Sequence, residues 1–333
     1  MSEESSMQAA VLHKFGDRPQ VTRVARPVAG PGEVLVRVAA SGVNPLDAKI
    51  RAGAAGHAGV QVPAILGIDL SGTVAAVGDG VRSFAVGASV FGMTGGVGDV
   101  PGSLAEYAAV DARLLAVAPA AWSPRQAAAV PLAAITAWEG LVDRAAVGDG
   151  DLVLVQGGAG GVGHIAVQIA AARGARVFAT GSVTDRELIA SLGATFIDYR
   201  AEPPEHYLRD HTGGEGFDVV LDTIGGSVLD ASFTVVRRYT GRVVSILGWG
   251  THSLAPLSFR GASYSGVFTL LPLLTGEGRD HHGEVLRAIA ALADEGRLTP
   301  VLDERTFTLA TLDGAHDLVE TGGGRGKVVV DVH

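Results

Sequence analysis

Through the middle of the chain, short apolar runs alternate with stretches in which apolar residues recur at helical spacing. The first run, LVLVQ at 152–156, leads through a glycine-rich turn into the helical pattern HIAVQIAAARG. Continuous apolar strands that alternate with helices are typical of a parallel sheet covered on both faces. The pattern therefore predicts a doubly wound α/β sheet of six strands, with the other five at 176–180, 195–198, 217–222, 242–246 and 262–269.

The first 120 residues have a different pattern, in which short β-type runs are separated by Gly and Pro turns. Examples are GEVLVRVAA, SGTVAAVG and SLAEYAAV. Such spacing is typical of a compact, barrel-like β domain. After the last α/β strand the chain returns to a helix, GEVLRAIAALADEGRL, and ends in an apolar strand. We expect a β-rich domain over 1–122, an α/β domain over 123–274, and a return to the first domain over 275–333.

The turn after the first apolar run carries the chemistry of a nucleotide site. Gly158, Gly160 and Gly163 fit the pattern G-x-G-x-x-G, and Gly161 and Val162 lie between them. Glycine is needed there for a sharp turn, for close approach of backbone to phosphate, and for packing of helix on strand. The helix that follows offers unpaired N–H groups and a positive dipole end to an anion. The sequence therefore predicts a dinucleotide site.

Composition and charge exclude several classes of function. The chain of 333 residues is 47% hydrophobic, carries a net charge of −9 and has a pI near 5.5, which argues against nucleic acid and anionic membranes as partners. Cysteine is absent, which excludes disulfides, thiolate catalysis and cysteine-ligated zinc. No apolar run is long enough to span a bilayer. The polar start, MSEESSMQAA, is predicted to be a short disordered tail of a cytoplasmic protein.

Five segments together resemble the medium-chain dehydrogenase/reductase superfamily, and most of all its zinc-independent quinone oxidoreductase branch. They are SGVNPLDAKIRAG, PAILGIDLSGTVAAVG, PLAAITAWEGL, VLVQGGAGGVGHIAVQIAAARGA and GRGKVVVDV. The resemblance covers nearly the whole chain. It implies a GroES-like catalytic domain, a Rossmann NADP-binding domain and an active site in the cleft between them.

The resemblance also implies that the catalytic metal is missing. Zinc-dependent members have Cys-x-Thr/Ser-Asp where this chain has Asn44 to Asp47, and Gly-His-Glu where it has Gly67, Ile68 and Asp69. The third ligand of those members falls near Leu132. A catalytic zinc needs three protein ligands. We therefore expect no metal, and a hydride transfer from NADPH to a quinone or an α,β-unsaturated carbonyl, whose developing charge hydrogen-bond donors can hold.

Asn44 and Asp47 are the candidate catalytic residues. The resemblance suggests that the Asn44 amide faces the cleft, with Asp47, Lys49 and Arg51 near it. The alternative is structural, because Asn followed by Pro is a good helix N-cap and Asp47 would then be an acid in the first helical turn. The sequence leaves both readings open.

Cofactor choice depends on the end of the second α/β strand. NAD-binding chains place an acid there, but here the strand ends Thr180-Gly181-Ser182. Arg186 follows and offers a planar fork of donors to a 2′-phosphate. Tyr199 occupies a position that touches the adenosine phosphate in similar reductases. These residues predict NADPH over NADH, although Asp185 argues the other way.

Further cofactor contacts come from the resemblance alone. It places Thr136 near the nicotinamide, the turn at Gly225 and Gly226 beside the ribose, and Gly248 and Phe268–Thr269 at the border of the nicotinamide. The alternative for the glycines is ordinary turn chemistry.

Other features remain open or belong to the surface. The run ASYSGVFT is rich in β-formers and uncharged, so as an edge strand it predicts a homodimer through that strand, as in family members. His281 and His282 are expected to be solvated or at the rim of the cleft, after an N-cap at Asp280. Two alternative functions are an enoyl-thioester reductase and a nucleotide-binding, crystallin-like protein with little turnover.

Overall fold

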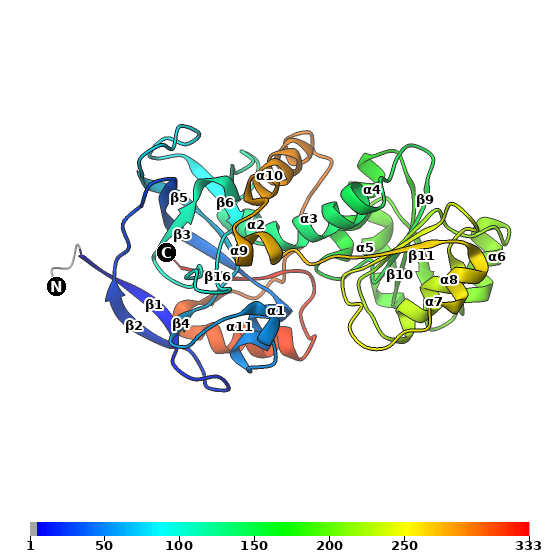
Figure 1. Cartoon of the computed structure of the whole chain (residues 1–333), viewed down its shortest axis with the longest axis horizontal. Helices are drawn as coiled ribbons and strands as arrows, with labels where there is room; N and C mark the ends of the chain where they lie inside the picture. Colours follow the sequence, from blue (N-terminus) through cyan, green and yellow to red (C-terminus); the bar gives the residue numbers. More distant parts are fainter. Residues whose placement is uncertain (1–4, 333) are drawn as a thin grey trace. The chain divides into compact units, whose positions relative to one another are not determined.

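The computed structural model describes residues 5–332, which form two compact units (Figure 1). The first unit contains the residues up to Leu132, then Leu270–Gly296 and the residues from Pro300 onward. The second unit contains Ala133–Thr269 and Arg297–Thr299. No helix among the described residues is long and apolar enough to cross a membrane.

The second unit is the predicted doubly wound sheet. All neighbouring strands are parallel, in the order β11-β10-β9-β12-β13-β14. The chain therefore moves outward from β9 in one direction, returns, and moves outward in the other, which places a topological switch point between β9 and β12. The strands are β9 (Leu152–Gln156), β10 (Arg176–Gly181), β11 (Thr195–Asp198), β12 (Val219–Asp222), β13 (Arg242–Ser245) and β14 (Ser263–Gly266).

Helices cover both faces of this sheet. The two helices that connect β9 to β10 and β10 to β11 pack on these strands. The next three crossover helices pack against one another in turn. Because crossovers are right-handed and the two sets run in opposite directions along the sheet, the sets lie on opposite faces. Apolar side chains of these strands and helices form the core, which includes Phe178, Phe217 and Phe233. The helices are α3 (Pro131–Trp138), η4 (Glu139–Arg144), α4 (Gly163–Ala172), η5 (Val183–Asp185), α5 (Arg186–Ser191), α6 (Pro204–Thr212), α7 (Ser227–Val235) and α8 (Ala255–Arg260).

The first unit is the predicted GroES-like β-rich domain. Its larger sheet has the order β15-β16-β3-β5-β6-β8, with β7 also paired to β3, and a smaller sheet has the order β2-β1-β4. The C-terminal strand pairs antiparallel with β3, so the end of the chain does return to the first domain. The strands are β1 (Ser6–Leu12), β2 (Gln20–Ala25), β3 (Glu33–Val43), β4 (Ala64–Ile65), β5 (Asp69–Val77), β6 (Ser89–Met93), β7 (Tyr107–Asp111), β8 (Leu115–Val117), β15 (Phe307–Thr308) and β16 (Val328–Asp331).

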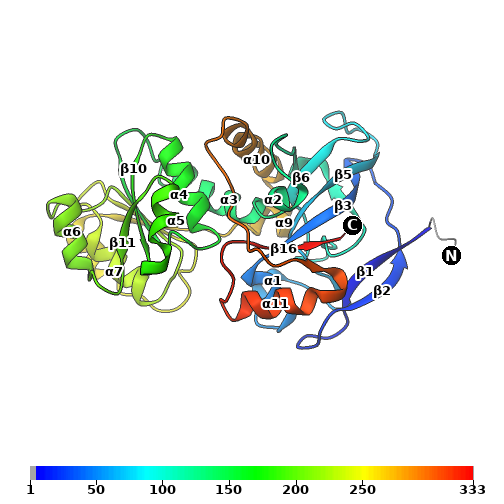
Figure 2. The same cartoon turned by 180° about the vertical axis from the view of Figure 1, so that it is seen from behind.

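The helices of the first unit lie around these sheets. Figure 2, from the opposite side, shows α11 against α1. The longest helix, α10, packs on β8 and on the short turn before it. The helices are α1 (Pro45–Arg51), η2 (Gly56–Ala58), η3 (Ala112–Leu114), α2 (Pro124–Ala128), α9 (Leu271–Thr275), α10 (Arg279–Asp294), η6 (Leu309–Thr311) and α11 (Leu312–Glu320).

The N-terminal stretch differs from its prediction as a disordered tail. Residues 1–4 lie outside the described residues, but strand β1 already begins at Ser6. Met7, Ala9 and Val11 alternate with other residues along it and pack with Ala105 in a small core. Ala10 and Leu12 on the other face are buried as well, so the second half of the strand is covered on both sides. The apolar residues after the acidic start therefore belong to the fold and not to a tail.

The unit boundaries also differ from the predicted ones. Residues 123–132 belong to the first unit, because Ala128 and Ala129 pack with Ala40 and Val329 in its core. Residues 297–299 belong to the second unit, where Gln168 exchanges hydrogen bonds with the backbone of Thr299. The first boundary shifts because small apolar residues pack against segments far away in the sequence. The second shifts because polar groups far apart in the sequence form hydrogen bonds.

The start of one helix is also displaced. Helix α10 begins at Arg279 after the N-cap Gly278, whose φ is 76°, so the N-cap lies two residues before the predicted one. Asp280 is an acid in the first turn instead. Glycine adopts this left-handed conformation without a steric cost.

Candidate nucleotide and catalytic sites

The glycine-rich turn after β9 is held by the side chain of Thr180 in the neighbouring strand. The Gly157 N–H donates to Thr180 Oγ1 at 2.9 Å, and that hydroxyl donates to Gln156 Oε1 at 2.9 Å. Gln156 is buried. Its only sequence signal is a polar residue at the end of an apolar run, so pattern alone did not mark it as a support of the turn.

Two of the predicted glycines lie where any side chain would collide. A Cβ on Gly158 would lie 2.5 Å from the Ala179 Cβ, and one on Gly163 would lie 2.0 Å from the carbonyl oxygen of Gly157. The backbone of the turn therefore lies directly against β10 and against the start of α4, where the positive end of the helix dipole favours an anion. This arrangement fits a dinucleotide pyrophosphate. The rest of the turn consists of Gly160, Gly161 and Val162.

At the end of β10, the predicted residues Ser182 and Arg186 already have partners. The Asp185 carboxylate accepts hydrogen bonds from the Ser182 N–H at 2.9 Å and hydroxyl at 2.5 Å. The Arg186 guanidinium lies 4.5 Å above the ring of Phe196 and is exposed. Asp185 thus serves as a local cap, while Arg186 keeps its charge at the surface.

A second arginine stands beside the predicted Tyr199. Arg200 donates from Nε to the Tyr199 hydroxyl at 3.2 Å, and both side chains are exposed. The Tyr199 N–H donates to the carbonyl of Gly181 at 3.4 Å, which places this pair next to the end of β10. Arg200 was not among the residues predicted from the sequence, although it follows Tyr199 directly and has the same fork of donors as Arg186.

The remaining strand ends carry the other predicted cofactor residues. The buried Asp222 accepts the Gly225 N–H at 2.9 Å and the Ser245 hydroxyl at 2.7 Å, so a carboxylate defines the turn at Gly225. The space above Gly248 is taken by the Tyr264 hydroxyl, 2.2 Å from where a Cβ would lie. The carboxyl ends of parallel strands share one edge of a sheet, which is where such sheets bind nucleotides. Thr269 is buried after β14, Phe268 lies edge-on to Trp249, and Thr136 is buried on α3.

In the first unit, Asn44 is the centre of a buried polar cluster. Its side-chain amide donates to Asp69 Oδ2 at 3.0 Å, and its side-chain oxygen accepts a hydrogen bond from the ammonium of Lys327 on the loop before β16. Asp47 Oδ2 accepts the backbone N–H of Asn44 at 2.8 Å. The four residues are at most 5% exposed. Both polar atoms of the amide therefore have protein partners.

This geometry separates the two readings of Asn44. Asn44 does hold the N-cap position of α1, with Pro45 in the first turn, but the hydrogen bond across the cap is made by the Asp47 carboxylate. A contact of the Asn44 amide with substrate stays a prediction, and the amide nitrogen has a second N–H beside the one that it gives to Asp69. Lys49 is exposed and Arg51 pairs with Glu320 at 2.6 Å, so neither takes part in the cluster.

Burial controls the charges of this cluster. It raises the pKa of Asp47 to about 7 and, against the opposing effect of Lys327, the pKa of Asp69 to about 6. It also lowers the pKa of Lys327, which the two carboxylates counteract. Asp47 Oδ1 is buried and hydrogen-bonded to no described residue. Near neutral pH the cluster therefore holds a proton that an exposed aspartate would have lost.

The cluster includes or adjoins Asn44, Ile68 and Leu132, the positions at which the resemblance places the ligands of zinc-dependent relatives. Asn44 contacts Asp69, the residue after Ile68, and the Leu132 N–H donates to Asp69 Oδ1 at 2.8 Å. Asp69 thus contacts both Asn44 and the backbone of Leu132. An isoleucine and a leucine side chain have no lone pair to offer a cation. Within residues 5–332, no group of three or more His, Asp or Glu side chains is placed to hold a metal ion.

The adjacent histidines separate into two environments. His281 is exposed near Glu284, as expected for a solvated residue. His282 is buried, so the prediction of a solvated or rim position is wrong for it. Burial lowers the pKa of His282 to about 4. Adjacent positions on a helix point in different directions, and α10 turns the second histidine onto the β domain.

We expect the stability of the protein to depend on the proton of Asp47. Because the pKa of Asp47 is raised on folding, the folded chain binds more protons than the unfolded chain between about pH 4 and pH 7. The stability that this protonation contributes is fully present below the pKa of Asp47 in the unfolded chain, and it is lost as pH rises through about 7. An Asp47→Asn variant should therefore lose less free energy of unfolding than wild type between pH 5 and pH 8, by on the order of 1–3 kcal/mol.

Urea denaturation at the two pH values measures this difference. The matched control is Asp79→Asn, since Asp79 is an exposed aspartate of the same unit, and its pH dependence should equal that of wild type. A wild-type stability that rises from pH 5 to pH 8 would contradict the expectation.

The comparisons with known proteins agree with this architecture. A family model described as "Alcohol dehydrogenase GroES-like domain" matches residues 30–120, and one described as "Zinc-binding dehydrogenase" matches residues 192–330. The 2-methylene-furan-3-one reductase of Solanum lycopersicum is 35% identical over 317 residues, which cover 93% of this chain and 74% of the tomato protein. The chain belongs to the medium-chain dehydrogenase/reductase superfamily.

Two further members of the superfamily extend the comparison. The NADPH-dependent alkenal/one oxidoreductase of Arabidopsis thaliana is 35% identical over 306 residues, which cover 90% of this chain and 72% of that protein. The crystal structure of an alcohol dehydrogenase superfamily protein from Novosphingobium aromaticivorans is 58% identical, covers 98% of this chain and 100% of its own, and superposes with a TM-score of 0.96. This medium-chain dehydrogenase/reductase is therefore an oxidoreductase with a nicotinamide cofactor.

Proposed function

We propose that this protein is an NADPH-dependent, zinc-independent reductase of α,β-unsaturated carbonyls or quinones. The observation that carries the proposal is the cluster around Asn44: where a zinc-dependent relative needs three ligands, this chain has an amide held by Lys327 and Asp69, an isoleucine and a leucine. The names of the tomato and Arabidopsis relatives, both reductases of conjugated carbonyls, support the same substrate class.

The chemistry suits a site without a Lewis acid. When bound, NADPH supplies a hydride. Addition of hydride to the β-carbon of an enone moves the π-electron pair onto the carbonyl oxygen, and the α-carbon then takes a proton from water. A quinone takes up the same hydride and one proton to become a hydroquinone. The charge is delocalised at every stage, so hydrogen-bond donors are sufficient to stabilise it.

The residues of the second unit fit the cofactor. The turn at Gly158 and Gly163 packs too closely on Ala179 and on the carbonyl of Gly157 to admit a Cβ, and a tight glycine turn of this kind lets backbone N–H groups approach a pyrophosphate. Arg186, Arg200 and Tyr199 would hold the 2′-phosphate at the ends of β10 and β11. The predicted contacts of Thr136, Gly225, Gly248, Phe268 and Thr269 with ribose and nicotinamide remain part of this proposal.

A substrate panel with purified protein tests the function. NADPH consumption should be fast with small quinones and with alkenals or enones and slow with crotonyl thioesters. Simple alcohols with NADP⁺ should form no NADPH. EDTA should leave the rates unchanged. A preference for crotonyl-coenzyme A would favour the enoyl-thioester reductase, and no turnover with any acceptor would favour the crystallin-like alternative. Loss of quinone and enone turnover in EDTA would exclude the zinc-independent mechanism.

The second expected result is a preference for NADPH over NADH. A charge-assisted contact to phosphate contributes roughly 1.5–3 kcal/mol, which corresponds to about tenfold to a hundredfold in affinity. Calorimetry should show this difference in wild type. Arg186→Gln and Arg200→Gln should each weaken NADPH and leave NADH unchanged, whereas Arg238→Gln, an exposed arginine of the same unit, should change neither. Equal affinities of wild type for the two cofactors would refute the preference.

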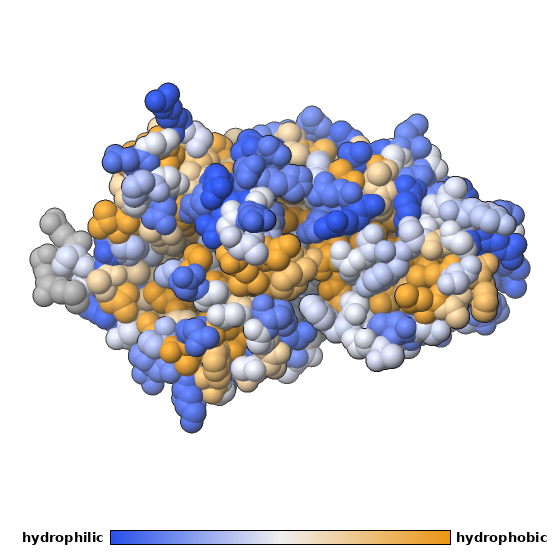
Figure 3. Space-filling model, viewed as in Figure 1, coloured by the Kyte–Doolittle hydropathy of each residue, from blue (hydrophilic) through white to orange (hydrophobic). Residues whose placement is uncertain are grey.

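We also propose a homodimer through the open edge of β14. Among the described residues, β14 pairs only with β13. Two apolar side chains in the segments before β14 are exposed, Tyr239 at 87% and Phe259 at 85%. Figure 3 shows an apolar patch over the position of α8. A strand edge with these neighbours favours pairing with a second copy.

The register of β14 defines a specific test of the dimer. Because the N–H groups of Ser263 and Val267 bond to β13, the N–H of Gly266 faces the open edge. Sedimentation of wild type at micromolar concentration should give a dimer, and Gly266→Pro should give a monomer, since proline has no N–H. Gly266→Ala is the control and should stay dimeric. A monomeric wild type would overturn the proposal.

A further inference from the structure

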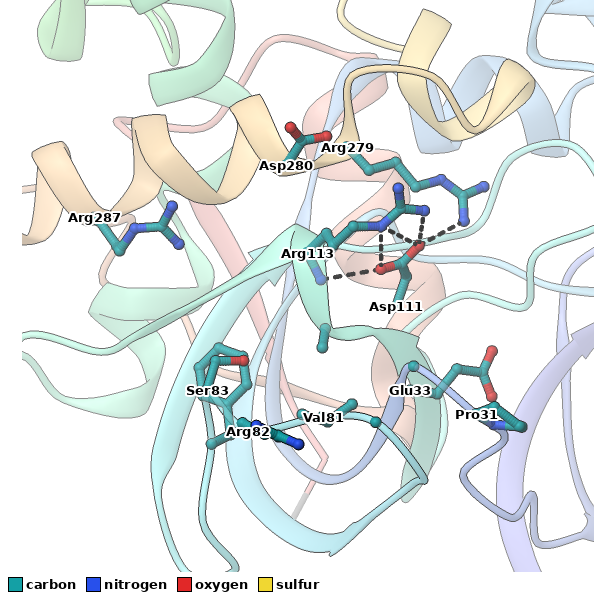
Figure 4. A pocket seen from close by; sticks show the side chains of 14 residues that line it. Pro31, Glu33, Val81, Arg82, Ser83, Asp111, Arg113, Arg279, Asp280 and Arg287 are labelled. Atoms are coloured by element: carbon teal, nitrogen blue, oxygen red, sulfur yellow. Dashed lines mark hydrogen bonds and ion pairs between the residues drawn. The ribbon is translucent and has the colours of Figure 1, made fainter.

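A cavity of about 610 Å³ lies in the first unit, lined by elements that the proposed reductase chemistry does not use. Its walls are the loop before β3, the loop between β5 and β6, the end of β7 with the turn after it, and helix α10 (Figure 4). The volume falls within the range of pockets that hold small ligands. Four arginines line it: Arg82, Arg113, Arg279 and Arg287.

The backbone fixes three of these walls to one another. The Gly32 N–H donates to the carbonyl of Asp79 at 2.8 Å, and the Gly32 carbonyl accepts the Ala112 N–H at 3.0 Å. Helix α10 lies so close to the turn after β7 that a Cβ on Gly283 would be 2.4 Å from the carbonyl oxygen of Arg113. The cavity is therefore a built feature of the fold.

Two of the arginines are occupied by one acid. Arg113 holds Asp111 through Nε at 3.0 Å and Nη2 at 2.8 Å, and Arg279 donates to the same carboxylate at 3.1 Å. Arg279 also donates to the carbonyls of Pro272 and Leu273, which anchors it. Burial acts to raise the pKa of Asp111, but the bonds from Arg113 and Arg279 outweigh it and the pKa lies below its usual range. Arg113 and Arg279 thus share the carboxylate of Asp111, and the carboxylate of Asp280 also acts on Arg113 at longer range.

The other two arginines have no acid. Arg82, from the loop between β5 and β6, and Arg287, on α10, make no hydrogen bond or ion pair within residues 5–332. Figure 4 shows them on opposite sides of the cavity. Of the remaining acids, Glu33 accepts the Gly30 N–H at 2.9 Å, and Asp280 lies in the first turn of α10, where the helix dipole stabilises it. In a chain of net charge −9, a cavity with unpaired guanidinium groups is a local attraction for anions.

We propose that this cavity is a binding site for a small organic phosphate, a phosphate monoester with an apolar part. Arginine forks match phosphate oxygens, and the lining carries four guanidinium groups against the three carboxylates of Glu33, Asp111 and Asp280, an excess of positive charge that favours an anion. The half-buried Val81, Phe84 and Ala112 give the cavity an apolar surface for the organic part. The site lies wholly within the first unit and needs none of the residues of the nucleotide site.

Calorimetric titration of the full chain with phenyl phosphate tests the proposal. Wild type should bind one phenyl phosphate per chain through this site, and the double variant Arg82→Gln/Arg287→Gln should bind it at least about tenfold more weakly. Both side chains are exposed and unpaired, so the variant should fold normally. The control is Lys14→Gln/Arg238→Gln, which removes the same two charges from exposed positions outside the cavity and should keep the affinity within about twofold.

Benzoate and inorganic phosphate define the ligand class. Benzoate, a monoanion, and inorganic phosphate, which has no apolar part, should each bind at least about tenfold more weakly than phenyl phosphate. No binding to wild type, or an equal loss in the two double variants, would overturn the site. If inorganic phosphate binds as tightly as phenyl phosphate, the ligand needs no apolar part. If benzoate binds as tightly, the site does not require a phosphate dianion. Either result would contradict the proposed ligand class.

Discussion

A Lys327→Met variant should lose about 3–5 kcal/mol of its free energy of unfolding at neutral pH, because it leaves buried carboxylates without their cation. In the folded protein the Lys327 ammonium donates to Asn44, which in turn donates to Asp69, and all three are buried. Methionine fills a similar volume but supplies neither charge nor donor. Urea denaturation monitored by circular dichroism measures the loss.

Two further variants isolate the charge from the packing. Lys49→Met removes an exposed lysine from the same unit and should change stability by less than about 0.5 kcal/mol. Adding Asp69→Asn to Lys327→Met removes one of the uncompensated charges and should recover part of the loss. The interpretation fails if Lys327→Met is as stable as the Lys49→Met control.

A Gly158→Ala variant should bind NADPH at least about tenfold more weakly, and Ala179→Gly should restore it in the double variant. The added methyl would lie 2.5 Å from the Ala179 Cβ, far inside van der Waals contact, so the turn must move away from β10. The backbone groups that approach the pyrophosphate would move with it. Removing the opposing methyl relieves the collision without touching the turn.

The double-variant cycle separates this effect from general destabilisation. Ala179→Gly alone should cost about 0.5–1 kcal/mol of stability and little affinity. Gly148→Ala, at a glycine of the same unit with nothing within 4 Å of the added methyl, is the control and should bind NADPH as wild type does. If Gly158→Ala/Ala179→Gly binds no better than Gly158→Ala, the contact with Ala179 is not what shapes the turn.

The sequence predicted the second unit better than the site of the first. Its strands are buried on both faces, so they read as continuous apolar runs, and the glycine turn has a local pattern. The Asn44 cluster has no such pattern. Lys327 lies 283 residues from Asn44, in a run whose hydropathy predicts only a strand, and an ammonium next to apolar residues is equally typical of a surface position.

The resemblance gave the positions of the catalytic candidates, whereas their burial and hydrogen bonds are known only from the structure. Resemblance located Asn44, Asp47 and the positions near Ile68 and Leu132, and the structure brings these positions together around Asp69. Side-chain burial could not be read from the same pattern, since a polar residue at a helix start is usually exposed. Arg200 was not predicted as a cofactor residue, because it lies next to the end of β10 only when β11 is the neighbour of β10 in the sheet.

The proton held on Asp47 affects how the kinetics of this protein should be interpreted. A carboxyl group that titrates near pH 7 while buried lowers the free energy of unfolding as pH rises, and under conditions where that free energy falls close to zero it would add an alkaline limb to the activity profile by reducing the fraction of folded molecules. That limb has the same shape as the ionisation of a catalytic acid. Rates measured across pH should therefore be divided by the folded fraction at each pH before a proton donor is assigned.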